Sequence, residues 1–233
     1  MRTAAFVASD NGDGHRVRCW ALSLELQRRG WRIVQSDADV LIMDDPDARV
    51  DQPHGALVCI VDVPAVKHPA DLVVCGSPGA GEEFLGLGKR VLYGPQYALL
   101  REEFTSRRWA TTTKALDSIF DMRAIQNMNA REIVGRIAEC SVVITHGGMR
   151  ALEAACAGAP LVIVPRNDGE MLNTRGLCRA HAAVSVTDAE AESVAKFLMW
   201  SPDILRTMSE SASNLVDGLG CQRVASAIDE VMP

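Results

Sequence analysis

The residues of this 233-residue chain best suited to chemistry lie in two glycine-rich turns. The first, Gly12-Asp13-Gly14-His15, follows an apolar segment and runs into a segment with helical patterning. Glycine adopts positive φ readily and leaves room for a ligand beside the backbone, and the N–H groups that open a helix attract anions. His15 titrates near neutral pH, so it can exchange a proton with a bound molecule. This turn predicts a site for an anion, or for the sugar next to one, with His15 as the candidate catalytic residue.

The second turn, Thr145-His146-Gly147-Gly148, also stands between an apolar strand and a helix. Backbone N–H groups at Gly148 and Met149 can hold a negative charge without a metal or a cationic side chain. Two such turns, one in each half of the chain, predict a ligand held between two lobes. We expect no cofactor and no metal.

Composition argues against several other classes of protein. The net charge of −6 and the pI near 5.4 give no basic surface for nucleic acid. The apolar run at the start is too short for a signal peptide, and no segment approaches the ~20 apolar residues of a membrane-spanning helix. The seven cysteines include no CxxC pair, so neither a zinc site nor a disulfide framework is indicated. We expect a cytoplasmic protein with no nucleic-acid partner and no membrane insertion.

Strand-like and helical segments alternate along most of the chain, which predicts an α/β fold with parallel sheets covered by helices. The expected strands are 4–8, 31–34, 40–43, 57–61, 72–75, 90–92, 141–145, 161–164 and 183–186. The expected helices are 16–29, 129–138, 149–157, 171–180, 189–200, 202–216 and 220–231. Residues 97–122 are polar with a helical pattern and predict a connection between lobes. We therefore expect an N-terminal lobe over 1–104, a connecting segment over 105–128 and a C-terminal lobe over 129–233.

Several segments resemble the PseG-type UDP-sugar hydrolases of pseudaminic acid biosynthesis and their spore-coat polysaccharide relatives. The most specific is Tyr93-Gly94-Pro95-Gln96-Tyr97-Ala98-Leu99-Leu100-Arg101-Glu102-Glu103-Phe104. Other matching segments, in the same order along the chain, are 12–19, 40–45, 61–62, 70–74, 144–148, 158–160 and 217–224. The family shares the GT-B architecture of the MurG-type glycosyltransferases. The resemblance thus implies two Rossmann-like lobes with parallel sheets.

The chain departs from the family in two places. Only residues 105–140 occupy an interval where the family carries several further strands and helices, so we expect a truncated second lobe. Met149 stands where the family usually has a hydroxyl residue that can contact phosphate. Loss of that hydroxyl removes about 1 kcal/mol of hydrogen bonding and leaves the backbone donors in place.

The resemblance also implies roles for particular residues. It assigns the catalytic base to His15, the ribose hydroxyls to Glu153, and contacts with the donor sugar to Asn173 and Glu170, the last an acid where an amide is more usual. Glu153 can instead be an acid favoured at the start of a helix.

Three further positions each keep two interpretations. Asp13 either orients His15 or is a turn residue, and Arg18 either positions the sugar or pairs with an acid. Tyr97, beside Gln96, either lines the cleft or packs under the connecting segment.

The function expected from these residues is hydrolysis of a UDP-linked acetamido sugar in surface polysaccharide biosynthesis. Water attacks the anomeric carbon, His15 takes its proton, and UDP leaves. A GT-B glycosyltransferase and a non-catalytic nucleotide-sugar-binding accessory protein are the alternatives. The truncated lobe also predicts exposed apolar surface that a second copy can cover, and hence a homodimer.

Overall fold

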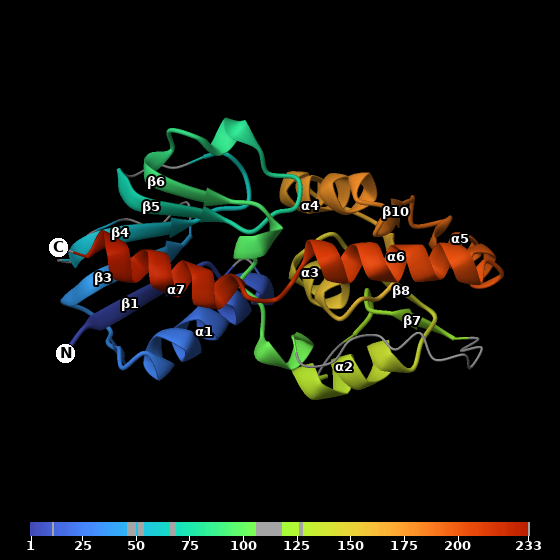
Figure 1. Ribbon diagram of the computed structural model, residues 1–233, viewed down its shortest axis with the longest axis horizontal. Helices are drawn as coiled ribbons and strands as arrows, with labels where there is room; N and C mark the ends of the chain where they lie inside the picture. Colours follow the sequence, from blue (N-terminus) through green and yellow to red (C-terminus); the bar gives the residue numbers. More distant parts are fainter. Residues whose placement is uncertain are drawn as a thin grey trace. The chain divides into compact units, whose positions relative to one another are not determined.

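The computed structural model describes residues 1–10, 12–45, 50, 54–65, 69–105, 118–125 and 128–232. The chain forms two compact units, one made of Met1–Leu100 with Leu219–Pro233 and the other of Arg101–Gly218. Each unit contains a parallel sheet with helices, as the alternating pattern predicts (Figure 1). Most of the connecting segment expected over 105–128 lies outside the described residues.

The first unit is built on a six-stranded sheet in the order β2-β1-β3-β4-β5-β6. Its strands are β1 (Thr3–Ala8), β2 (Arg32–Ile33), β3 (Ala38–Asp44), β4 (His54–Ile60), β5 (Ala70–Cys75) and β6 (Gly88–Tyr93). All of these pairings are parallel, and each strand overlaps one expected from the sequence. The strand order reverses at β1, because β2 lies on one side of it and β3 on the other.

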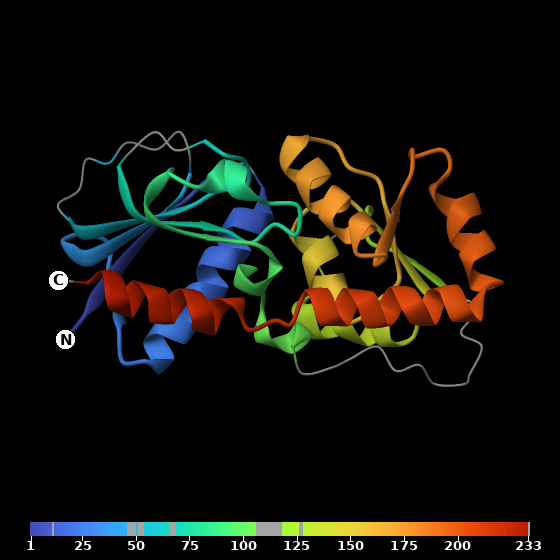
Figure 2. The same cartoon turned by 45° about the horizontal axis from the view of Figure 1, so that its top comes forward.

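Helices α1 (Asp13–Arg28) and α7 (Gly220–Val231) cover the same face of this sheet (Figure 2). Alternate strand residues such as Val40 and Ile42 share one buried cluster with Leu22 of α1 and Ile228 of α7. Side chains alternate between the two faces of a strand, so every second apolar residue reaches these helices.

Helix α1 begins three residues earlier than the sequence pattern indicated. Gly12 has the expected positive φ, 116°, and precedes the first helical residue. Gly14, which could also adopt positive φ, lies instead inside the first turn of the helix. His15 therefore projects from regular helix, whose hydrogen bonding fixes its backbone.

The last helix differs from expectation in its partner. The predicted boundary grouped 219–233 with the second lobe, whereas α7 packs on the first sheet through Val224 and Ile228. Its first residue, Gly220, lies so close to Ala98 that a Cβ there would stand 2.0 Å from the Ala98 carbonyl oxygen. Glycine permits this approach, and the apolar face of α7 holds it there.

The second unit has four strands where the first has six, in the order β10-β9-β8-β7. The strands are β7 (Ile119–Asp121), β8 (Val142–Thr145), β9 (Leu161–Ile163) and β10 (Ala183–Ser185). Its helices are α2 (Ala130–Ala138), α3 (Met149–Cys156), α4 (Asp168–Arg179), α5 (Ala191–Met199) and α6 (Pro202–Leu215). Residues of β8 and β9 pack with α5 and α6 in a common apolar cluster.

Strand β7 corrects the helical prediction for 97–122. The described parts of that interval contain the end of one 3₁₀ turn (Pro95–Tyr97), a second (Glu102–Phe104) and β7, which pairs with β8. The apolar stretch of β7 is Ile119-Phe120, which is too short to show the alternation of a strand. The strand conformation of β7 therefore depends on pairing with the longer β8, and the local sequence does not indicate it.

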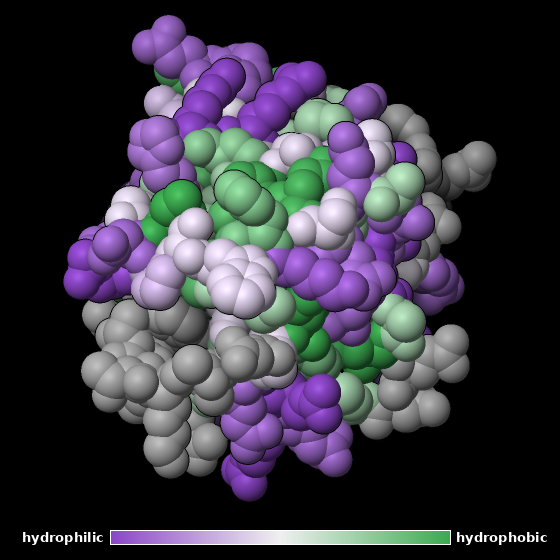
Figure 3. All heavy atoms as spheres, turned by 90° about the vertical axis from the view of Figure 1, so that its right-hand side faces the viewer, coloured by the Kyte–Doolittle hydropathy of each residue, from purple (hydrophilic) through white to green (hydrophobic). Residues whose placement is uncertain are grey.

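Apolar side chains are exposed where α5 meets α6. Phe197, Trp200 and Ile204 are 68%, 86% and 47% exposed. Figure 3 looks toward this end of the second unit and shows apolar side chains gathered among polar ones. The homodimer expected from the sequence stays a prediction.

Among the described residues, no helix is both long enough and apolar enough to cross a bilayer.

The contact at Gly220 predicts a clear stability difference between two glycine substitutions. We expect Gly220→Ala to destabilise the protein by about 2 to 3 kcal/mol, because the new methyl group collides with the Ala98 backbone. Gly135→Ala, in α2, is the matched control. Its Cβ meets nothing within 4 Å, so improved helix propensity should stabilise the protein by about 0.5 to 1 kcal/mol. Urea unfolding measures both, and equal effects would contradict the packing of α7.

Candidate active site

The candidate catalytic residues lie where the order of the first sheet reverses. In open α/β sheets such a reversal opens a crevice at the carboxyl ends of the strands, where ligands bind. His15 stands in the first turn of the helix that follows β1. Asp44 is the last residue of β3 and pairs in register with Ala8, the last residue of β1. Asp62 comes just after β4, at the same edge of the sheet.

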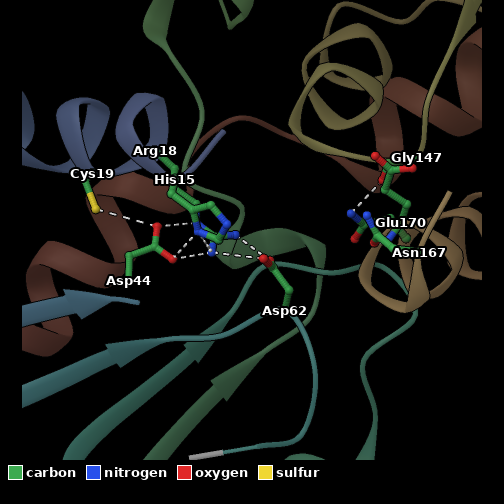
Figure 4. A network of polar contacts seen from close by, with 9 residues as sticks. His15, Arg18, Cys19, Asp44, Asp62, Gly147, Asn167 and Glu170 are labelled. Carbon is green, nitrogen blue, oxygen red and sulfur yellow. Dashed lines mark hydrogen bonds and ion pairs between the residues drawn. The ribbon is translucent and has the colours of Figure 1, made fainter. Parts of the chain in front are cut away.

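His15 and Asp44 form a hydrogen-bonded pair. The distance from His15 Nδ1 to Asp44 Oδ1 is 2.9 Å, and Asp44 is buried (Figure 4). An ionised carboxylate accepts but cannot donate, so the hydrogen-bond pattern assigns the proton to Nδ1 and leaves the lone pair of a neutral ring on Nε2. Within the described residues no group is hydrogen-bonded to Nε2. The pair has the arrangement of a general base held by an acid.

Arg18, one turn along α1, ties this pair to a second carboxylate. Its Nε donates to Asp44 Oδ2 at 2.5 Å, its NH2 group donates to Asp44 Oδ1, and its NH1 group donates to Asp62 Oδ1 (Figure 4). The 3.1 Å separation between Arg18 NH2 and His15 Nδ1 joins two donors, so it is proximity and not a hydrogen bond. The thiol of Cys19 lies 3.6 Å from Asp44 Oδ2. Three side chains of α1, those of His15, Arg18 and Cys19, thus converge on Asp44 and Asp62.

These contacts shift the proton affinities of the site. The hydrogen bond to Asp44 raises the pKa of His15 above 6.5, against the opposing effect of burial. Burial disfavours the charge of Arg18, but the two carboxylates outweigh this and raise its pKa further. Partial burial works against ionisation of Asp62, and the Arg18 guanidinium nevertheless lowers its pKa. Arg18 and Asp62 are therefore a charged pair at neutral pH.

The other candidates in the first unit take different positions. Asp13 is exposed, and the acid bonded to His15 among the described residues is Asp44. Of the two interpretations of Arg18, the structure places it with acids. Tyr97 lies in a 3₁₀ turn and packs against the apolar core of the first unit.

Close packing shapes the turn at Gly147 and Gly148 in the second unit. A Cβ on Gly147 would lie 2.3 Å from the backbone oxygen of Glu170, so α4 can approach only a glycine. Asn173 Nδ2 donates to the Gly147 carbonyl at 2.8 Å and holds the two segments together. A Cβ on Gly148 would meet nothing nearer than Glu170 Oε1 at 3.6 Å. Gly148 precedes Met149, the first residue of α3, so this turn adjoins the N–H groups that open that helix.

Each of the two candidate acids of the second unit forms an ion pair. The carboxylate of Glu170 accepts from the backbone N–H of Arg166 at 2.7 Å and from its guanidinium at 2.6 Å. Glu153 is fully buried and binds Arg101 through both oxygens, at 2.6 and 2.7 Å. Burial raises the pKa of Glu153, and Arg101 opposes that shift. Gly147, Gly148, Met149, Glu170 and Asn173 thus lie together, whereas Glu153 is enclosed with Arg101 and cannot meet a ribose as it stands.

Sequence reasoning missed the partners Asp44, Asp62, Arg101 and Arg166. A signal for the first two was present, because each directly follows or ends an apolar strand, and neighbouring parallel strands bring their carboxyl ends together. No group of acidic, histidine or cysteine residues suited to a metal ion occurs in the described parts of the chain.

Comparison with known proteins finds solved structures with a similar fold. No protein-family model matches the sequence, and no curated protein matches it significantly. Among solved structures, Acinetobacter baumannii MurG has 14% sequence identity and a TM-score of 0.63, covering 99% of this chain and all of the other. The S. aureus MnaA–UDP co-structure has 10% identity and a TM-score of 0.68, with 98% and 96% covered. The spinosyn rhamnosyltransferase SpnG complexed with thymidine diphosphate has 14% identity and a TM-score of 0.61, with 98% and 100% covered.

At such identities the similarity concerns the fold alone. The chain has the two-unit α/β fold of the GT-B glycosyltransferases. The narrower resemblance to PseG-type hydrolases stays a prediction.

The His15–Asp44 pair predicts how stability depends on pH. A histidine whose pKa is raised on folding stabilises the folded state fully below the unfolded pKa, near 6.5, and this contribution is lost as pH rises through the folded pKa. The difference in unfolding free energy between wild type and His15→Asn should therefore shrink as the pH rises above about 6.5. His181→Asn changes an exposed histidine whose φ of 59° asparagine tolerates, and it serves as the control. A difference that grows with pH would exclude the assigned ion pair.

Proposed function

We propose that the protein hydrolyses a UDP-linked acetamido sugar and releases UDP. The observation that carries the proposal is the His15–Asp44 pair at the sheet edge, with Nε2 free of protein partners among the described residues. Water attacks the anomeric carbon, the bond from that carbon to the phosphate oxygen breaks, and the electron pair leaves with UDP. His15 Nε2 takes the proton of the water, and Asp44 stabilises the imidazolium that forms. General-base assistance of this kind accelerates a reaction about 100- to 10,000-fold.

The second unit is proposed to hold the diphosphate. Gly148 and Met149 lie at the start of α3, and the N-terminus of a helix favours an anion. Two of the structurally similar proteins were solved with a nucleoside diphosphate, UDP in one and thymidine diphosphate in the other. The role of Glu153 toward ribose would require its release from Arg101.

A glycosyltransferase is the second candidate, and the similarity to a rhamnosyltransferase favours it. The same base would then take the proton of an acceptor hydroxyl instead of a water molecule. A non-catalytic binding protein would keep the nucleotide site without turnover. Water-dependent UDP release separates these possibilities.

Removal of His15 should abolish turnover and spare nucleotide binding. We expect His15→Asn to lower UDP release from UDP-N-acetylated sugars by at least about 100-fold, because the general base is lost. The affinity for UDP, measured by calorimetry, should stay near that of wild type, and His181→Asn should release UDP at the wild-type rate. If wild type binds UDP and releases none from any sugar, the hydrolase proposal fails.

Gly148→Ala should report on the diphosphate site. The structure accommodates the new methyl group without a clash, so the midpoint of thermal unfolding should change little. The methyl group would occupy the space that a phosphate needs beside α3, and we expect UDP affinity to fall about 10-fold or more. Gly135→Ala, in α2, is the control for binding. Unchanged UDP affinity in Gly148→Ala would place the diphosphate elsewhere.

A further inference from the structure

Arg18 binds two carboxylates at the same time. Its Nε and NH2 groups donate to Asp44, and its NH1 and NH2 groups donate to Asp62, the NH2 contact to Asp62 Oδ2 measuring 3.1 Å. Asp44 Oδ1 also accepts from His15 Nδ1 at 2.9 Å. A continuous series of charged hydrogen bonds therefore runs from Asp62 through Arg18 and Asp44 to His15 (Figure 4).

The two ends of this series differ in their access to solvent. The Asp44 side chain is 1% exposed, whereas that of Asp62 is 44% exposed. Asp44 is occupied by His15, Arg18 and the thiol of Cys19. Asp62 does not contact His15 directly in a hydrogen bond that the structure records, so any effect on the imidazole passes through Arg18 or through space.

The charges of the cluster show why a second carboxylate matters. One cation, Arg18, and two anions give a net charge of −1 when His15 is neutral, and protonation of His15 brings the cluster to zero. Without Asp62 the cluster would start at zero and protonation would create a net positive charge. In a partly buried site, cancelling a charge is easier than creating one.

We propose that Asp62 is a positioning residue for His15, acting through Arg18: it balances the guanidinium, so that Asp44 is free to orient the imidazole and stabilise its charge. This inference rests on the proposed function, in which His15 is the base. Within the part of the chain that the structure describes, the charged groups that act on His15 are Asp44 from β3, Arg18 from α1 and Asp62 from the segment after β4. The hydrogen bond and charge of Asp44, and the charge of Asp62, raise the pKa of His15, while burial and Arg18 lower it.

The test is an NMR titration of the His15 ring C–H signals in the free full-length protein. We expect Asp62→Asn to move the titration midpoint of His15 to lower pH, and Asp44→Asn to move it further. Asp62→Glu, which keeps the charge, should restore a midpoint close to that of wild type. Asp37→Asn removes the same charge just before β3, at the end of that strand opposite Asp44, and should leave the midpoint unchanged.

An unchanged midpoint in Asp62→Asn would overturn the proposal, and so would equal shifts in Asp62→Asn and Asp37→Asn, which would indicate a general charge effect. Asp62→Ser removes the same charge and replaces the asparagine variant if that variant does not fold. The titration needs no substrate. Failure to release UDP would therefore refute the proposed function without touching this inference, and an unmoved midpoint would refute the inference alone.

In an active enzyme the same variant should also move the acid limb of the pH–rate profile to lower pH, because that limb reports the base of the free enzyme. A merely structural Asp62 would lower the rate equally at every pH.

Discussion

The buried carboxylate of Asp44 is the group on which the sheet edge around His15 depends. Burying an unpaired charge is costly, and a single missing partner typically destabilises a protein by about 3 to 5 kcal/mol. Asp44 is compensated by the Arg18 guanidinium, the ring N–H of His15 and the thiol of Cys19, all from the first two turns of α1. The start of α1 and the end of β3 are therefore fixed to one another by charge as well as by apolar packing. This requirement also fixes which nitrogen of His15 is open.

The sequence predicts strands well where their apolar runs are long. It predicts side-chain pairings less well where the two partners lie far apart in the sequence. All six strands of the first sheet were expected, because each is an apolar run bounded by turn residues. Strand β7 was missed, since two apolar residues carry no period. The glycine turn and His15 were expected from local chemistry, but Asp44 and Asp62 lie 29 and 44 residues from the side chains they bind. Pairings at such separations follow from strand order, which a single sequence does not reveal.

The second unit shows how one glycine pair serves two purposes. Gly147 allows α4 to pack against the turn, whereas a Cβ on Gly148 would approach no atom closer than 3.6 Å. A sequence motif cannot separate the two, because both positions are glycine for different physical reasons. At Glu153, by contrast, a motif match did not predict the contacts of the side chain. The residue matched a motif by spacing, and in the structure the same side chain is enclosed with Arg101.

The return of α7 to the first sheet makes the second unit an insertion within the first. During synthesis, residues 1–100 leave the ribosome long before 219–233, so part of the first sheet must wait with one face uncovered. Residues 101–218 form a continuous stretch and can fold in that interval. The first unit, which carries His15, is thus the last to be completed. Its apolar face over β1, β3 and β4 is the surface that a chaperone would meet during that delay.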